Sequence, residues 1–503
     1  MSLEQLTGLD SAFLFLDGRH APMHIGSVQI YAPPKGGFDF DRLKDLLSRR
    51  VDLSPLLKRR VVQVPLRLGR PFWADDPHFD LDRHLARAAL PAPAGWAELR
   101  RLAEEVFSQP LDPDRPLWDM TVVEGLAGVP GLPDGGFAVI FKVHHAAADG
   151  MGAVDLYKIL WDETPEPRSR APGTLVRPAP MPGSVELLGM AARGVVTQPL
   201  ATLRWAGELV RGGVGYGREW IAGRHHRPPA PFSAPRSAIN QPIGGRRSFD
   251  ALTLSLTRIG ALRSLNPGTT VNDVVLTACG GGLARYLARR NDLTEASLVA
   301  MVPISVRGDL EAGANHVSAM LIPLETGERE PVDRLHAIHT HAQDSKAYAN
   351  ALGASTLADS QQFLPFSLAT AAARLYSGFH LSKLHRPPFN LVITNVPGPR
   401  HPLYLAGARM LNVYGTAPVF DGLGLILVIT SYLDHLTVSA TADHDTVADP
   451  EQLVEDIAAE FDALERAAAE EAGVPTSRRA SSRGKKKRAK VRSRSRKVAT
   501  GKP

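Results

Sequence analysis

Strand-like and helix-like patterns alternate along two long stretches of this 503-residue chain, and a segment rich in Pro and Arg separates them. The first stretch covers residues 1–165 and the second covers residues 246–473. Mixed strands and helices in two halves of similar size predict an α/β (α+β) fold with two lobes, each a mixed sheet flanked by helices. We find no short internal repeat.

The first lobe contains three β-rich runs and two segments with helical spacing. A Gly- and Pro-rich turn at 131–136 separates the last two runs, so we expect them to pair as a hairpin. The expected strands are 25–31, 120–124 and 137–143, and the expected helices are 40–51 and 96–107.

The second lobe repeats this mixture. Strands are expected at 249–256, 298–306, 319–324, 389–394, 411–414, 424–432 and 436–442. Helices are expected at 274–289, 331–348, 368–376 and 450–472.

Residues 166–245 are expected to join the lobes. The part up to residue 184 is a Pro-, Arg- and Ser-rich linker. Residues 185–224 alternate apolar patches with Arg and contain two Trp residues, which is typical of one or two amphipathic helices. Such helices either pack on a lobe or lie on a membrane surface, and the pattern leaves both open.

The basic charge of the chain is concentrated at its end. Residues 474–503 hold 13 of the 58 Lys and Arg residues and no acidic residue, so the first 473 residues carry 45 basic and 52 acidic side chains. We therefore expect a mildly acidic globular body with a disordered basic tail. The high isoelectric point is a property of the tail and does not indicate a specific nucleic-acid binder.

Cys279 is the single cysteine, which excludes an internal disulfide framework and a multi-cysteine metal site. The N-terminus has neither a basic nor a long apolar segment of the signal-peptide type, and no apolar run approaches the ~20 residues of a membrane helix. We expect a cytoplasmic protein that is not secreted and not integral to a membrane.

The segment that carries chemistry is an apolar strand that runs into His144-His145-Ala-Ala-Ala-Asp149-Gly150. Because side chains alternate along a strand, the two imidazoles are expected to face opposite ways, which disfavours a shared metal. One histidine can then act as a base and the other as a structural partner. The alternative is that both histidines are satisfied core residues and that Asp149 caps the next helix.

Other catalytic signatures are missing from the sequence. It has no Gly-x-Ser-x-Gly elbow, no phosphate-binding Gly-x-x-x-x-Gly-Lys-Ser/Thr, no strand-linked Gly-x-Gly-x-x-Gly and no His-Glu-x-x-His. Serine-based covalent catalysis, nucleotide binding and a metal site are therefore not expected.

The histidine segment resembles the His-His-x-x-x-Asp-Gly motif of the chloramphenicol acetyltransferase-like superfamily, which includes peptide-synthetase condensation domains. Further segments narrow the resemblance to the bacterial wax ester synthase/acyl-CoA:diacylglycerol acyltransferase family, over residues 5–470. These segments are Leu9-Asp10-Ser-Ala-Phe13, Pro116-Leu117-Trp118, Asn272-Asp273, Pro303-Ile-Ser-Val-Arg307 and Asn395-Val-Pro-Gly-Pro399.

The resemblance implies a two-lobed fold with an active-site tunnel between the lobes. It also implies that His145 is the general base, that His144 and Asp149 fix the geometry, and that no cofactor is needed. The expected substrates are a long-chain acyl-CoA and either diacylglycerol or a fatty alcohol, used at the inner membrane or a lipid body.

The supporting residues also have structural interpretations. Gly150 permits a tight turn, and Pro116-Leu117-Trp118 can anchor the start of a strand. Asn272 is placed to cap the helix expected from residue 274, beside Asp273, although the family treats this pair as important for activity. Asn395–Pro399 suits a rigid turn after a strand.

Two other functions remain open at this point. One is a condensation-type acyltransferase that takes its acyl group from a carrier protein, against which the lack of a flanking carrier domain argues. The other is a non-catalytic protein that binds lipid or nucleic acid through its basic tail.

Overall fold

The computed structural model describes residues 4–65, 69–129, 131–149, 153–168, 229–305, 317–327, 329–352 and 381–471, and isolated residues at 183, 186–187 and 189. The basic tail, the helix expected at 368–376 and most of the segment between the lobes lie outside these residues. The predictions made for them therefore stay predictions.

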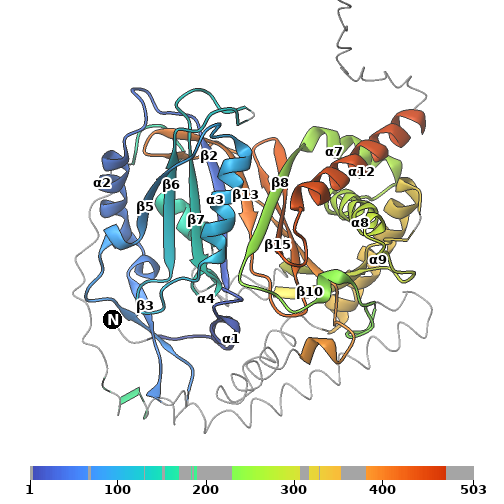
Figure 1. Cartoon of the computed structure of the whole chain (residues 1–503), viewed down its shortest axis with the longest axis horizontal. Helices are drawn as coiled ribbons and strands as arrows, with labels where there is room; N and C mark the ends of the chain where they lie inside the picture. The colour runs from blue at the N-terminus through green and yellow to red at the C-terminus, as the bar shows by residue number, and fades with distance from the viewer. Residues whose placement is uncertain are drawn as a thin grey trace, which may run out of the picture.

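Two six-stranded sheets, each flanked by helices, form the two lobes, as the sequence predicted (Figure 1). The N-terminal sheet has the order β12-β13-β2-β7-β6-β5. Its strands are β2 (His24–Tyr31), β5 (Leu85–Ala89), β6 (Trp118–Glu124), β7 (Phe137–His144), β12 (Tyr404–Leu405) and β13 (Ala408–Thr416). The helices of this lobe are α1 (Gly8–Leu16), α2 (Phe40–Arg50), α3 (Trp96–Ser108), α4 (His145–Asp149) and α5 (Ala153–Leu160).

The C-terminal sheet has the order β10-β9-β11-β14-β15-β8. Its strands are β8 (Arg247–Ser255), β9 (Val299–Ser305), β10 (Val317–Pro323), β11 (Leu391–Val396), β14 (Leu425–Tyr432) and β15 (His435–Asp443). The helices of this lobe are α7 (Leu256–Leu262), α8 (Val271–Arg289), α9 (Pro331–Leu352) and α12 (Pro450–Glu471). All seven strands expected here are present, counting β13, and the helices expected from 274, 331 and 450 are confirmed.

A small third sheet has the order β1-β4-β3. Its strands, β1 (Glu4–Gln5), β3 (Arg59–Val62) and β4 (Phe72–Asp75), were not predicted. They are two to four residues long and half-buried, so they carry little periodicity.

Part of the N-terminal sheet comes from the second half of the chain. The segment of β12 and β13 lies within the range expected for the C-terminal lobe, yet β13 pairs with β2 of the N-terminal sheet over six residue pairs. Figure 1 shows this late segment beside β2. The N-terminal sheet is therefore completed by a part of the chain that follows most of the C-terminal lobe.

The central strand of the N-terminal sheet, β7, is buried at all eight positions because helices cover both of its faces. Even Lys142 is buried, and its ammonium donates to the carbonyls of Val106 (3.1 Å) and Gln109 (2.8 Å) at the end of α3. Val106 lies in the last turn of α3 and Gln109 is its C-cap, a place where the helix dipole favours a cation. Burial lowers the pKa of Lys142.

One stripe of α3 joins the two lobes through hydrogen bonds spaced four residues apart. Trp96 donates to Asp250 (2.7 Å), Arg100 to Glu451 (2.5 Å), and Glu104 and Ser108 accept backbone N–H groups of β8 (3.0 and 2.8 Å). Positions four apart share one face of a helix. The helix that covers the N-terminal sheet therefore also fixes the edge of the C-terminal sheet.

The C-terminal core surrounds α8, which contains three consecutive glycines at its centre. A Cβ on Gly280 would lie 2.3 Å from the carbonyl oxygen of Leu324, and one on Gly282 would lie 2.7 Å from the backbone of Ile457 in α12. Glycine disfavours a helix interior by about 1 kcal/mol. Here it permits neighbouring backbones to pack directly against α8.

We expect Gly282→Ala to lower the stability of the protein despite the higher helix propensity of alanine. Overpacking against the α12 backbone costs about 1–3 kcal/mol. The matched control is Gly260→Ala in α7, where a Cβ meets nothing within 4 Å and the melting temperature should rise slightly. A melting temperature for Gly282→Ala equal to or above that of the wild type would contradict this description of the packing.

Candidate active site

Two successive backbone amides fix the end of β7. The N–H of His144 donates to the carbonyl of Leu117 (2.9 Å), just before β6, and the N–H of His145 donates to the carbonyl of Met23 (2.9 Å), just before β2. Because β6 and β2 flank β7, the two histidines are held from both sides. The strand ends at His144 and His145 begins α4, so strand alternation cannot be extended to His145 as the sequence analysis did.

The ring of His144 is almost fully buried, with 2% of the residue exposed. Its Nδ1 accepts the N–H of Ala146 (3.1 Å), so the proton of the neutral ring lies on Nε2. Nε2 lies 3.8 Å from Oδ1 of Asp17. Burial, with the nearby imidazole of His145, lowers the pKa of His144 to about 3. His144 is therefore uncharged near neutral pH.

His145 is only half-buried, and its imidazole stacks on the ring of Phe13 with centroids 3.8 Å apart and planes 16° apart. Phe13 belongs to α1, which packs against α4 (Figure 1). Of the two histidines, His145 is thus the more exposed one.

The rest of the motif is only partly described. Asp149 ends α4, but its side chain and residues 150–152 lie outside the described residues, and α5 begins at Ala153. The roles predicted for Asp149 and Gly150 therefore stay predictions.

Pro116, Leu117 and Trp118 are buried at the start of β6. The indole of Trp118 donates to the carbonyl of Leu57 (3.0 Å) and stacks on His84 at 4.6 Å. Since the carbonyl of Leu117 receives the His144 amide, this segment supports the backbone of the motif as well as anchoring a strand.

Asn272 and Asp273 lie in the first turn of α8, in the other lobe. The prediction that Asn272 caps this helix is wrong, because the helix begins at Val271 and Thr270 is its N-cap. Thr270 and Asp273 form a capping box, with Asp273 Oδ2 accepting the N–H of Thr270 (2.8 Å). Asp273 also contacts Nδ1 of His339 at 2.9 Å. Within the described residues, no hydrogen bond or ion pair joins Asn272 or Asp273 to either motif histidine.

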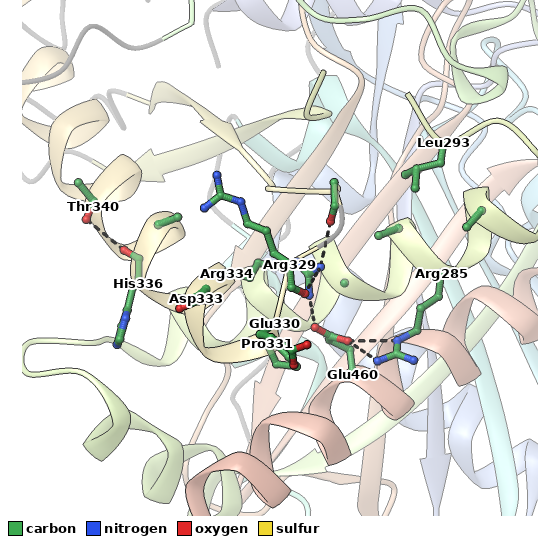
Figure 2. Close-up of a pocket in the computed structure, with 15 residues that line it drawn as sticks. Arg285, Leu293, Arg329, Glu330, Pro331, Asp333, Arg334, His336, Thr340 and Glu460 are labelled. Atoms are coloured by element: carbon green, nitrogen blue, oxygen red, sulfur yellow. Dashed lines mark hydrogen bonds and ion pairs between the residues drawn. The ribbon is translucent and has the colours of Figure 1, made fainter. Parts of the chain in front are cut away.

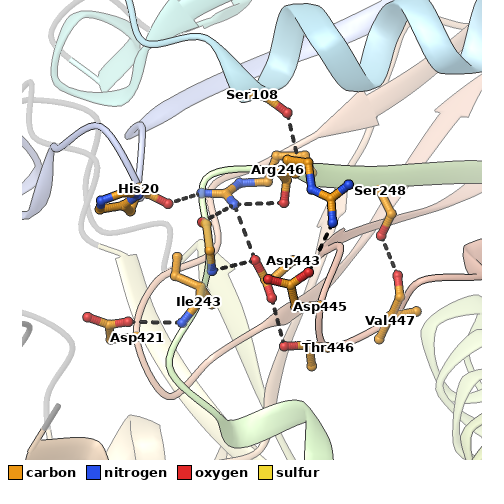
Figure 3. A network of polar contacts seen from close by, with 12 residues as sticks. His20, Ser108, Ile243, Arg246, Ser248, Asp421, Asp443, Asp445, Thr446 and Val447 are labelled. Atoms are coloured by element: carbon orange, nitrogen blue, oxygen red, sulfur yellow. Dashed lines mark hydrogen bonds and ion pairs between the residues drawn. The ribbon is translucent and has the colours of Figure 1, made fainter.

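A buried arginine connects the C-terminal lobe to the loop between α1 and β2. Figure 3 shows the network of polar contacts around His20 and Asp443 to which it belongs. Arg247, at the start of β8, donates to the carbonyls of His20 and Gly244 and lies 3.7 Å from Asp443. The same loop contains Asp17 and ends at Met23, which holds the His145 amide. Asp17, Met23 and Arg247 belong to no motif in the sequence, and a backbone carbonyl has no residue signature.

A cavity of about 1150 Å³ lies among α8, α9 and α12. Figure 2 shows its charged wall, in which Glu460 pairs with Arg285 (2.8 Å) and Arg334. A smaller cavity of about 60 Å³ lies beside the motif and is lined partly by Ala147 and Ala148. Neither cavity contains His145, and the tunnel between the lobes stays a prediction.

The described part of the chain contains no cluster of three or more His, Cys, Asp or Glu side chains that could hold a metal ion. It also contains no helix long and apolar enough to cross a membrane.

Two family models match the chain. Residues 6–275 match the wax ester synthase/diacylglycerol acyltransferase catalytic domain, and residues 313–465 match the WS/DGAT C-terminal domain. Two relatives from Mycobacterium tuberculosis carry the provisional name diacylglycerol O-acyltransferase. One is 33% identical over 468 residues (92% of this chain, 99% of the relative), and the other is 32% identical over 456 residues (89% and 87%).

Solved structures show the same architecture. The wax ester synthase/diacylglycerol acyltransferase from Marinobacter aquaeolei VT8 matches with a TM-score of 0.66 and 28% identity, over 93% of this chain and all of that one. The first condensation domain of the calcium-dependent antibiotic synthetase matches with a TM-score of 0.51 and 16% identity, over 92% and 97%. The second likeness concerns the fold alone.

The low pKa of His144 predicts a pH dependence of stability. An unfolded histidine binds a proton near pH 6.5, whereas folded His144 binds one only near pH 3. Stability is therefore lost as the pH falls from about 6.5 toward 3, at up to about 1.4 kcal/mol per pH unit from one such group. We expect melting temperatures of His144→Asn to depend less steeply on pH than those of the wild type.

The matched control is His78→Asn, because His78 is exposed in a loop. Its melting temperatures should follow the wild-type slope between pH 6.5 and 4.5. A His144→Asn slope as steep as the wild-type slope would show that folding does not keep His144 neutral.

Proposed function

Since this chain belongs to the wax ester synthase/diacylglycerol acyltransferase family and is therefore an acyltransferase, we propose that it moves a long-chain acyl group from acyl-CoA to the hydroxyl of diacylglycerol. The product is triacylglycerol. Fatty alcohols are the second acceptor class and give wax esters. The observation that carries the proposal is the half-buried His145 at the end of the central strand, in the order of residues that the family's motif requires.

His145 is the proposed general base. Its imidazole takes the proton of the acceptor hydroxyl, and the oxygen attacks the thioester carbonyl carbon to form a tetrahedral oxyanion. The oxyanion collapses, the carbon–sulfur bond breaks, and the CoA thiolate takes up the proton from the imidazolium. Holding both substrates beside the base provides much of the rate enhancement. The reaction requires no cofactor and no acyl-enzyme.

The different environments of the two histidines support this assignment. His144 is buried, uses Nδ1 to accept a backbone N–H and has a pKa of about 3, so it is a poor proton acceptor near pH 7. His145 is half-buried, and its backbone is held by Met23. In this proposal His144 and Asp149 fix the geometry of the site.

The chemistry of the substrates supports a location at a lipid surface. Diacylglycerol and fatty alcohols reside in membranes and lipid bodies, so an enzyme that acts on them gains from binding that surface. We place the protein peripherally at the inner membrane or at lipid bodies, with the 13 basic residues of 474–503 adding attraction to anionic lipid.

We expect purified protein to release CoA from palmitoyl-CoA when dioleoylglycerol or hexadecanol is supplied in lipid vesicles. His145→Ala should lower kcat by about 10²–10⁴-fold, as expected for the loss of a general base. His78→Ala, an exposed histidine in the same lobe, should keep wild-type activity. Thiol release and product chromatography with each acceptor provide the measurements.

Two results would redirect the proposal. Folded protein that transfers nothing from palmitoyl-CoA but accepts an acyl group from a carrier protein would be a condensation-type enzyme. Function that is lost on deletion of residues 474–503 but unaffected by His145→Ala would belong to a non-catalytic protein acting through its tail.

A further inference from the structure

The histidines lie against a segment near the N-terminus that we call the α1 arm, residues 8–23, comprising α1 and the loop to β2. This arm reaches His145 through one side chain and one backbone carbonyl. It also brings a carboxylate close to His144.

The side-chain contact is the stack of Phe13 on His145. Two aromatic rings at 3.8 Å with planes 16° apart are in direct face-to-face contact. An imidazole turns about its Cβ–Cγ bond, and the energy well for that torsion is broad. Rotation of the His145 ring would drive its edge into the phenyl ring, so Phe13 restricts the plane in which the imidazole nitrogens point.

The backbone contact depends on Asp17. Its Oδ1 accepts the N–H of Met23 (2.8 Å), and the carbonyl of Met23 accepts the N–H of His145 (2.9 Å). The same Oδ1 lies 3.8 Å from Nε2 of His144, the nitrogen that carries the proton. One carboxylate therefore orders the loop that holds His145 and also faces His144.

Both ends of the arm are fixed. At its start, Thr7 and Asp10 form a capping box, in which the N–H of Asp10 donates to Thr7 Oγ1 (3.1 Å). Phe13 follows Asp10 by one helical turn. At the other end, Arg247 of the C-terminal lobe donates to the carbonyl of His20. The backbone on both sides of Phe13 is therefore held by contacts outside the motif.

We infer that Phe13 is a positioning residue for the proton transfer by His145, and that the α1 arm is the element that holds it in place. The ring keeps the imidazole in the orientation in which a nitrogen meets the acceptor hydroxyl. This inference rests on the proposed role of His145 as the base. Phe13 itself takes no part in bond making.

The test compares Phe13→Ala and Phe13→Leu with Phe13→Tyr, which restores an aromatic ring. A misplacement of about 1 Å costs up to about 100-fold in rate. We expect Phe13→Ala to lower kcat by about 10–100-fold with KM for palmitoyl-CoA within about twofold, Phe13→Leu to lower it less, and Phe13→Tyr to recover most of it. Leu16→Ala, an exposed position of the same helix, should match the wild type.

A second readout does not require turnover. A stacked phenyl ring shifts the NMR signals of the imidazole protons of His145, which the spectrum of His145→Gln assigns. The shift should vanish in Phe13→Leu and persist in Phe13→Tyr. A wild-type protein that shows the shift but transfers no acyl group would refute the proposed function and leave the stacking intact.

Three results would overturn the inference. The first is an unchanged kcat in Phe13→Ala and Phe13→Leu. The second is a change confined to KM, which would make Phe13 part of a substrate-binding surface. The third is loss of kcat in proportion to loss of melting temperature in all three variants, with no recovery in Phe13→Tyr.

Discussion

The backbone hydrogen bonds of two neighbouring amides, those of His144 and His145, determine the geometry on which the rest of the site depends. They donate in opposite directions, to carbonyls that precede β6 and β2. A strand that ends between two paired neighbours cannot shift along its axis without breaking both bonds. The turn from β7 into α4 therefore begins at a fixed place, and the side chains that follow start from fixed backbone positions.

This constraint gives two identical residues different properties. His144 is buried in the packed interior, and this burial, with the neighbouring imidazole of His145, keeps its ring uncharged although the Asp17 carboxylate lies 3.8 Å away. His145, one residue later, begins the helix α4. Its imidazole stacks on an aromatic ring, and the residue is only half-buried. One dipeptide thus provides a buried neutral imidazole and a half-buried one, because the secondary structure changes between the two residues.

Much of the fold could be predicted because its main elements carry strong local patterns. The buried run of β7, the alternation in the second lobe and the long helices α8, α9 and α12 all appear where periodicity indicated them. The pairing of β13 with the N-terminal sheet could not be predicted, because contacts between β2 and residues 408–416 leave no local pattern in the sequence.

The site, too, could be predicted only in part. The motif histidines and the Pro116–Trp118 segment were identified by residue type, and they do meet at one end of β7. The carbonyls that hold them belong to residues whose side chains are irrelevant to the contact. The helix at Asn272 begins three residues earlier than its apolar pattern indicated, because the capping box of Thr270 and Asp273 starts it at Val271.

The late position of β13 in the chain also affects when the N-terminal sheet can be completed during synthesis. During synthesis, β2 and β7 leave the ribosome long before β13 exists, so the nascent N-terminal sheet presents the open edge of β2 while most of the second lobe is translated. An unpaired strand edge is a site of aggregation. That edge of the N-terminal sheet stays open until residues 408–416 emerge and pair with β2.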